Sequence, residues 1–195
     1  MYPVSAEGDF VVLTLRVEEA EVNRQSSLAG SAASVLGGGV SERETCVTRV
    51  LPLSSTEIAA RAYSNNSRLL SVEFPDGLTG IGVDAFSHCS LSEVRIPGSV
   101  SVISERAFFG CGRLQNIHLG EGVKRIECQA FANCGPMGSP ILVDVPLSVT
   151  HIAYDAFERV QRTPGKDCVY IRTPINSYAY KWVQEHAGSV QLWNK

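Results

Sequence analysis

The sequence lacks the features that mark several classes of protein. Of its 195 residues, 19% are charged and the net charge is −3, without a block of like charges. Nucleic-acid-binding proteins usually carry a basic patch, so this composition argues against a nucleic-acid partner. No apolar run approaches the ~18 to 20 residues needed to cross a bilayer, which argues against insertion into a membrane.

A targeting signal is also missing. Residues 1–9 contain neither the basic region nor the apolar stretch of a secretory signal peptide. We therefore expect that the chain is intracellular, or else that it is a mature form or a piece of a longer protein. The localisation stays open between these alternatives.

What the sequence does contain is a repeat. The phenylalanine of an Ala-Phe pair returns at Phe86, Phe108, Phe131 and Phe157, at intervals of 22, 23 and 26 residues, and a degenerate copy ends at Tyr63. Self-similarity with a period of 20 to 50 residues is the signature of a solenoid. The recurring residues are then expected to form the core that joins the coils.

The clearest repeat unit covers residues 91–113. Val94 and Ile96 alternate with polar residues, as a half-buried strand requires, and Pro97 ends that strand. Across residues 100–108 the apolar positions are three and four apart, which predicts a helical turn or a 3₁₀ segment. Each unit is therefore predicted to be one strand followed by a short helical or irregular stretch.

Stacking such units at the spacing of hydrogen-bonded strands, ~4.8 Å, buries their apolar sides in one continuous core. The predicted fold is an α/β solenoid of about five coils with one parallel sheet face, short helical or irregular convex segments and terminal caps. The units are expected at residues 46–68, 69–90, 91–113, 114–140 and 141–167, with a final strand at 168–174.

The cysteines follow the same period. Cys89, Cys111 and Cys134 each lie three residues after a repeat phenylalanine. Free cysteine packs as a small buried hydrophobe, so these residues are predicted to form a column of reduced thiols in the core. The sequence has no C-x-x-C pair that would indicate a zinc site.

Residues 91–111 resemble a known repeat. A strand followed by Ile-Pro-x-Ser-Val, x-x-Ile and x-x-x-Ala-Phe-x-x-Cys is similar to the BspA-type leucine-rich repeat. The resemblance covers about residues 46–174, with departures at Tyr63, Asn66 and Val160. It implies the roles of that family, which occurs in surface proteins of bacteria and some protists and mediates adhesion or protein recognition. It also implies a cell-surface location, whereas a start at Met1 and reduced thiols favour the cytoplasm.

The two ends differ from the repeats. Residues 1–45 are predicted to form an N-terminal cap, with a strand at 9–17 and a Ser/Ala/Gly-rich loop at 25–43. Residues 175–195 are predicted to form a C-terminal capping helix and strand, with Ser177 or Asn176 as the helix N-cap. Tyr178, Trp182 and Val183 are expected on the packed face of that helix.

The sequence contains no convincing catalytic, cofactor or metal site. Gly37-Gly38-Gly39 lacks the Lys-Ser or Lys-Thr of a P-loop. His118 and Asp144 fall one repeat apart in the same strand column, where a His–Asp pair could orient a general base, but outward strand positions are polar by default. His88 before Cys89 is a weak hint of a reactive thiol. We therefore predict that the protein is not an enzyme and needs no cofactor.

The outward strand positions remain as the candidate binding surface. Their mixture of charged, polar and apolar residues suits protein recognition better than phosphate binding. We expect a protein or surface ligand as the partner; the alternative is a structural spacer or stalk of a larger surface protein, with no binding role. The candidate residues are Ser71, Glu73, Glu93, Arg95, Asn116, His118, Leu142, Asp144, Tyr170 and Arg172.

Overall fold

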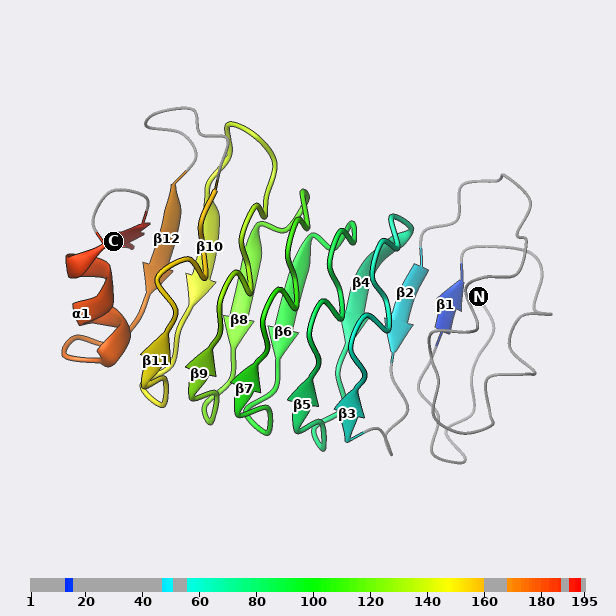
Figure 1. The fold of residues 1–195 in the computed structure, drawn as a ribbon, viewed down its shortest axis with the longest axis horizontal. Helices are drawn as coiled ribbons and strands as arrows, with labels where there is room; N and C mark the ends of the chain where they lie inside the picture. The colour runs from blue at the N-terminus through cyan, green and yellow to red at the C-terminus, as the bar shows by residue number, and fades with distance from the viewer. Residues whose placement is uncertain (1–12, 16–46, 51–55, 160–167, 187–189, 194–195) are drawn as a thin grey trace.

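The fold is a stack of short coils. The structure, a computed structural model, describes residues 13–15, 47–50, 56–159, 168–186 and 190–193. Successive coils lie side by side along the long axis of the molecule (Figure 1). Each of the central coils contributes a longer strand to one side and a two-residue strand to the other. The predicted solenoid of about five coils is therefore confirmed.

The longer strands form the sheet face. They are β1 Leu13–Leu15, β2 Val47–Val50, β4 Leu69–Glu73, β6 Glu93–Ile96, β8 Asn116–Leu119, β10 Ile141–Asp144, β12 Val169–Arg172 and β13 Val190–Leu192. Five of them form a parallel sheet in the order β13-β12-β10-β8-β6. The strands β2 and β4 pair in parallel in a second ladder, in which β1 is antiparallel to β2. The sheet face thus consists of two ladders, and the boundary between them lies between β4 and β6.

The two-residue strands form another parallel ladder, which lies opposite the sheet face (Figure 1). It consists of β3 Glu57–Ile58, β5 Gly80–Ile81, β7 Val102–Ile103, β9 Arg125–Ile126 and β11 His151–Ile152, each of which buries its isoleucine. The expectation of a helical turn or a 3₁₀ segment across residues 100–108 is therefore wrong, because this stretch contains the strand β7 and turns. Val100 closes a turn with Pro97 through a 3.1 Å backbone bond, whereas Ile103 lies in β7. The three-residue interval spans a corner of the coil rather than a turn of helix.

The turns after the short strands form a further ladder between coils. The amide of Asp84 donates to Glu105 at 3.1 Å, and that of Phe86 to Ala107 at 2.7 Å. The amide of the intervening Ala85 instead donates within its own coil, to Gly82 at 3.2 Å. Every second amide therefore links neighbouring coils, a pattern that a helix cannot make because its amides all bond within the segment. The left-handed residues that permit it are Arg61, Asn65, Asp84, His88, Arg106, Gly110, Gln129 and Asn133.

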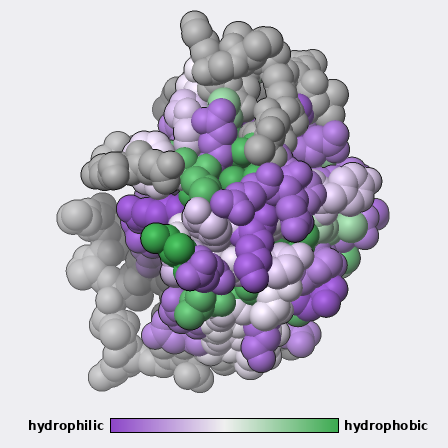
Figure 2. All heavy atoms as spheres, turned by 90° about the vertical axis from the view of Figure 1, so that its left-hand side faces the viewer, coloured by the Kyte–Doolittle hydropathy of each residue, from purple (hydrophilic) through white to green (hydrophobic). Residues whose placement is uncertain are grey.

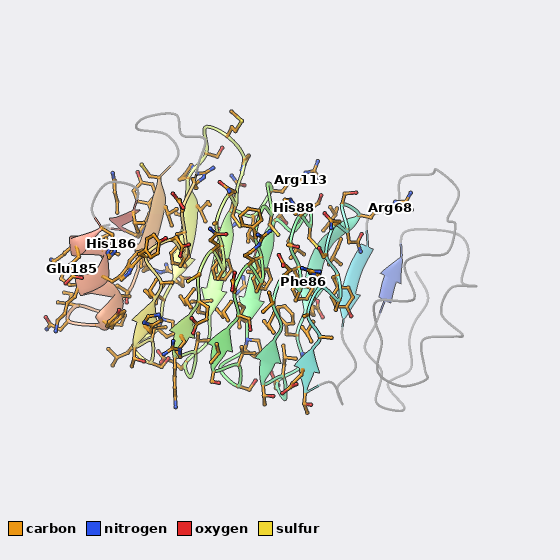
Figure 3. All side chains as sticks on the ribbon, viewed as in Figure 1. Arg68, Phe86, His88, Arg113, Glu185 and His186 are labelled. Atoms are coloured by element: carbon orange, nitrogen blue, oxygen red, sulfur yellow. The ribbon has the colours of Figure 1, made fainter. Side chains whose placement is uncertain are left out.

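Aromatic rings from the Ala-Phe repeats stack through the centre of the coils. From Tyr63 through Phe86, Phe108 and Phe131 to Phe157, neighbouring ring centroids lie 5.1 to 5.6 Å apart and the ring planes differ by 11° or less. All five residues are buried, and Figure 3 shows Phe86 between the two layers of strands. The spacing matches the separation of hydrogen-bonded strands, so one ring from each coil fits into a continuous stack.

The cysteine column lies beside this stack and is buried, as predicted. Each thiol donates to a carbonyl of the preceding coil at 3.1 Å: Cys89 to Tyr63, Cys111 to Phe86 and Cys134 to Phe108. The three thiols are unbridged. They therefore act as small core residues that also satisfy backbone carbonyls between coils.

A helix covers the C-terminal end of the stack. Helix α1 spans Tyr178–Glu185, and the side chain of Ser177 accepts a hydrogen bond from the amide of Tyr180 at 3.0 Å. Trp182 closes the aromatic stack edge-on against Phe157, with centroids 6.2 Å apart. Trp182 and Val183 are buried as expected, but Tyr178 is 40% exposed, so it does not belong to the packed face. The buried position there belongs to the next residue, Ala179.

Some predicted features lie outside the described residues. They are the Ser/Ala/Gly-rich loop at 25–43, most of the predicted strand at 9–17 and the end of the fifth unit at 160–167. The roles of residues 1–45 and 175–195 as caps stay predictions.

In the first repeat, β2 pairs Arg49 with Val72 and Val50 with Glu73, so Arg49 occupies a position that is apolar in the later coils.

Candidate functional site

The pleat of the strands determines which side chains reach the sheet face. In β6, Val94 and Ile96 point into the core, whereas Glu93 and Arg95 point outward. Parallel register then aligns the outward residues of successive strands in two columns. The first column is Glu93, Asn116, Leu142, Tyr170 and Gln191; the second is Arg95, His118, Asp144 and Arg172.

A chain of ionic contacts runs across this face. Asp144 accepts three of these contacts: His118 Nδ1 is 2.6 Å from Oδ2, and Arg172 approaches both carboxylate oxygens, with Nε 2.6 Å from Oδ1 and Nη2 2.6 Å from Oδ2. Further along, His118 Nε2 is 3.7 Å from Glu93 Oε1. Glu93 is also paired with Arg95, Oε1 to Nη2, at 2.5 Å. The basic side chains of Arg95, His118 and Arg172 thus alternate with the carboxylates of Glu93 and Asp144 across four strands.

These contacts change the acidity of Asp144. Partial burial of the carboxyl group favours its neutral form, but hydrogen bonds from Arg172 and His118 outweigh that effect and lower the pKa of Asp144. Hydrogen bonding to Asp144 in turn raises the pKa of Arg172. Asp144 is therefore ionised at neutral pH and holds the Arg172 guanidinium in a two-point contact.

A small groove opens beside this network, towards the C-terminal end of the sheet face. Its volume is about 130 Å³, and two aromatic rings form part of its wall: Tyr170 and Trp193 lie edge-to-face with centroids 5.5 Å apart. The amide of Trp193 donates to Ile171 at 2.9 Å, which extends the pairing of β13 with β12. The groove is lined by Asn116, His118, Leu142, Val143, Asp144, Tyr170, Arg172 and Trp193.

The structure brings together most, but not all, of the predicted site residues. Eight of them, on β6, β8, β10 and β12, share the five-stranded sheet: Glu93, Arg95, Asn116, His118, Leu142, Asp144, Tyr170 and Arg172. Ser71 and Glu73 lie on β4 in the other ladder. Trp193 was not among the predicted site residues. Its signal in the sequence was the expected last strand at 190–193, whose outward column passes from Arg172 to this residue.

The groove contains one element of a catalytic site. His118 and Asp144 do form the hydrogen bond that can orient a general base. However, the groove lining, taken over the described residues, includes no serine, threonine, cysteine or lysine that would serve as a nucleophile. Over the same residues, no group of three or more His, Cys, Asp or Glu side chains is placed to hold a metal ion.

The weak hint of a reactive thiol at Cys89 is not supported by its surroundings. Burial, together with the nearby Cys111 thiol, raises the pKa of Cys89 to about 12. Its neighbour His88 is exposed and packs edge-on against Phe109, with centroids 5.4 Å apart. A nucleophilic cysteine needs a thiolate in an accessible, electropositive setting, so Cys89 is a structural residue.

Other exposed charged residues lie away from the sheet face. Arg68 and Arg113 are exposed and extend outward at the same edge of the coils as His88 (Figure 3). They provide matched positions at which surface charge can be changed without altering the network around Asp144. Across the part of the chain that the structure describes, no helix is both long and apolar enough to span a membrane.

Comparisons with known proteins agree with this architecture. The family model described as "BspA type Leucine rich repeat region" matches residues 44–163 in six copies. A search of curated proteins finds no match.

Among solved structures, the chain is similar to the pneumococcal vaccine antigen PcpA, with a TM-score of 0.53 and 22% identity over 64% of this chain and 30% of that one. It is also similar to a leucine-rich cell surface protein from Faecalibacterium prausnitzii A2-165, with a TM-score of 0.41 and 18% identity over 76% of this chain and 60% of that one. The chain thus spans less than two thirds of the length of each of these proteins.

Proposed function

The chain belongs to the BspA-type leucine-rich-repeat family, and on that premise we propose that it is a non-catalytic recognition protein that binds a protein or a surface ligand through its sheet face. The observation that carries this proposal is the contrast between two sets of residues. The stacked rings and thiols repeat from coil to coil and are buried. The outward columns change residue from each coil to the next, so they can carry specificity.

The composition of the sheet face supports a protein partner. Protein interfaces combine an apolar or aromatic centre with a polar rim, and they are rich in Tyr, Trp and Arg. On this face Tyr170 and Trp193 lie next to Arg172, and the charged groups of Arg95 and Glu93 lie further out. A phosphate-binding surface would instead require an excess of positive charge. The face carries cations and carboxylates in pairs.

A comparison of captured partners tests this proposal against the spacer alternative. The intact chain and a variant with Glu93→Lys, Arg95→Glu and His118→Glu are each used to capture proteins from the same extract. A control variant carries Arg68→Glu and Arg113→Glu at the edge of the coils, away from the sheet face. The proposal predicts that partners are lost with the sheet-face variant and kept with the control.

The spacer alternative predicts a different result. A stalk without a binding role yields the same list of proteins for all three chains. All three chains have to be folded at the temperature of the capture, which thermal unfolding checks, so that a loss of partners reflects the surface and not the fold. Identical partner lists from the folded chains would rule out the sheet face as the binding surface.

A further inference from the structure

The groove beside Asp144 suggests what kind of group the sheet face receives. We infer that it holds one uncharged apolar side chain, the size of a leucine or a phenyl ring, presented by the protein partner. This inference rests on the proposed function, because it assigns a specific part of the sheet face to one residue of the partner.

The size of the groove sets the first limit. Its volume is about 130 Å³. Sites for drug-sized ligands and cofactors occupy roughly 300 to 1,000 Å³, so the groove is too small for them. A cavity of ~150 Å³ is known to take one benzene ring. The available space therefore fits one side chain and not a whole small molecule.

The charges around the groove set the second limit. Arg172 contacts both oxygens of Asp144, and His118 adds a third short contact to the same carboxylate. The cation and the anion of the groove thus neutralise each other. A charged group of a partner would lose its hydration there without gaining an unpaired opposite charge, which is costly. An uncharged group avoids that cost.

The apolar lining sets the third limit. Leu142 and Tyr170 are half-buried, and Trp193 is 37% exposed. The end of the molecule that carries α1 and β13 exposes apolar residues in small patches among hydrophilic ones (Figure 2). Aromatic walls of this kind form the centres of interfaces, where an apolar anchor contributes most of the binding energy.

The groove is also fixed before any partner arrives. The strand β13 pairs with β12, and buried Val190 holds it to the core. Tyr170 and Trp193 contact each other edge-to-face, which restricts both rings. A preformed site loses less conformational freedom on binding, so even a single anchoring side chain can contribute to affinity.

Selection from a displayed library of random linear peptides tests this inference without a known partner. The intact chain is the target, and the selected peptides are then measured against Leu142→Glu, Trp193→Ala and the control Arg113→Glu. We expect an enriched motif with Leu, Ile, Met or Phe at one fixed position. Its affinity should fall about tenfold or more with the two groove variants, as for an interface hot spot, and stay unchanged with the control.

Fluorescence gives a second measurement of the same event. In a Trp182→Phe background, Trp193 is the only tryptophan. Binding of the selected peptide in the groove should shift the emission of Trp193 to shorter wavelength, because the ring leaves water. An unchanged spectrum with a bound peptide would place that peptide elsewhere and overturn the inference.

Failure of this inference is distinguishable from failure of the proposed function. Peptides that lose affinity with Arg95→Glu but not with Leu142→Glu would refute the groove and leave the sheet face as the binding surface. Charged anchors in the enriched motif, or a library that yields no binder, would also count against the groove. The capture experiment with whole partners decides separately whether the sheet face binds anything.

Discussion

At the scale of single residues, the aromatic stack shows why the Ala-Phe pair repeats. Phe108 is fully buried, and its ring lies 5.2 Å from both Phe86 and Phe131. Its neighbour Phe109 is only half-buried and lies at the surface under the guanidinium of Arg106, 4.4 Å away. The two adjacent phenylalanines therefore have the same chemistry and different roles, and of the two only Phe108 belongs to the buried ring stack that runs from coil to coil.

This difference predicts the effect of truncation. Phe108→Ala should lower the free energy of unfolding by ~3 to 5 kcal/mol, because it removes a buried ring and leaves a cavity between two others. Phe109→Ala should cost clearly less, since that ring is partly exposed. Chemical denaturation of both variants measures the difference. Equal losses for the two variants would show that the stack is not the core.

Asp144 gives the residue-scale prediction for pH. Its pKa is lowered in the folded protein, so ionised Asp144 stabilises the fold at pH values above its unfolded pKa of about 3.9. That contribution should be lost as the pH falls through the lower folded pKa. The difference in unfolding free energy between wild type and Asp144→Asn should therefore be largest near pH 7 and shrink below about pH 4. A difference that is constant from pH 7 to pH 3 would exclude the network.

At the scale of elements, the corners of the coils depend on close contact between backbones. Gly98 follows the turn proline Pro97, and a Cβ atom added there would collide with the carbonyl oxygen of Glu121 in the next coil. At Gly77, in the corresponding turn of the preceding coil, an added Cβ meets nothing within 4 Å. The two glycines thus lie in corresponding turns, one and two residues after the turn proline, and differ in their surroundings.

This contrast gives an element-scale prediction. Gly98→Ala should destabilise the protein by ~1 to 3 kcal/mol, because the backbone of one of the two coils has to shift. Gly77→Ala should be close to neutral, since its methyl group points into open space. Thermal unfolding of the two variants provides the comparison. A Gly98→Ala variant as stable as Gly77→Ala would contradict the described packing of neighbouring coils.

Elements also show where sequence patterns stop being informative. The strands of the sheet face were predictable, because residues such as Val94 and Ile96 alternate with outward polar residues. The opposite ladder was not, because a strand of two residues, such as Val102–Ile103, is too short to show alternation. The left-handed turns were also hidden, since Asp84 and Arg106 adopt a conformation that usually indicates glycine.

At the scale of the whole molecule, the period of the repeat was sufficient to predict the fold. Fixed spacing places equivalent residues side by side, and this is why His118 and Asp144 could be assigned to one column before the structure was known. The sequence could not show the two-point contact of Arg172 with Asp144 or the groove beside it. Both depend on side-chain conformations and on Trp193 continuing the column beyond the last repeat.

The same reasoning separates stability from recognition in the whole molecule. Buried columns repeat because each coil must stack on the next, and a change there should unfold the protein. Outward columns are free of that constraint. The central claim is therefore that specific binding depends on the sheet face and is independent of the edge that carries Arg68 and Arg113.

The most direct test is the dissociation constant of a purified partner, measured for the intact chain, the sheet-face variant and the edge control. The sheet-face variant carries Glu93→Lys, Arg95→Glu and His118→Glu, and the control carries Arg68→Glu and Arg113→Glu. The account predicts that the sheet-face changes raise the dissociation constant about tenfold or more, measured at a temperature at which all three chains are folded, and that the control binds like the intact chain. An unchanged dissociation constant for the sheet-face variant, with weaker binding by the edge control, would contradict it.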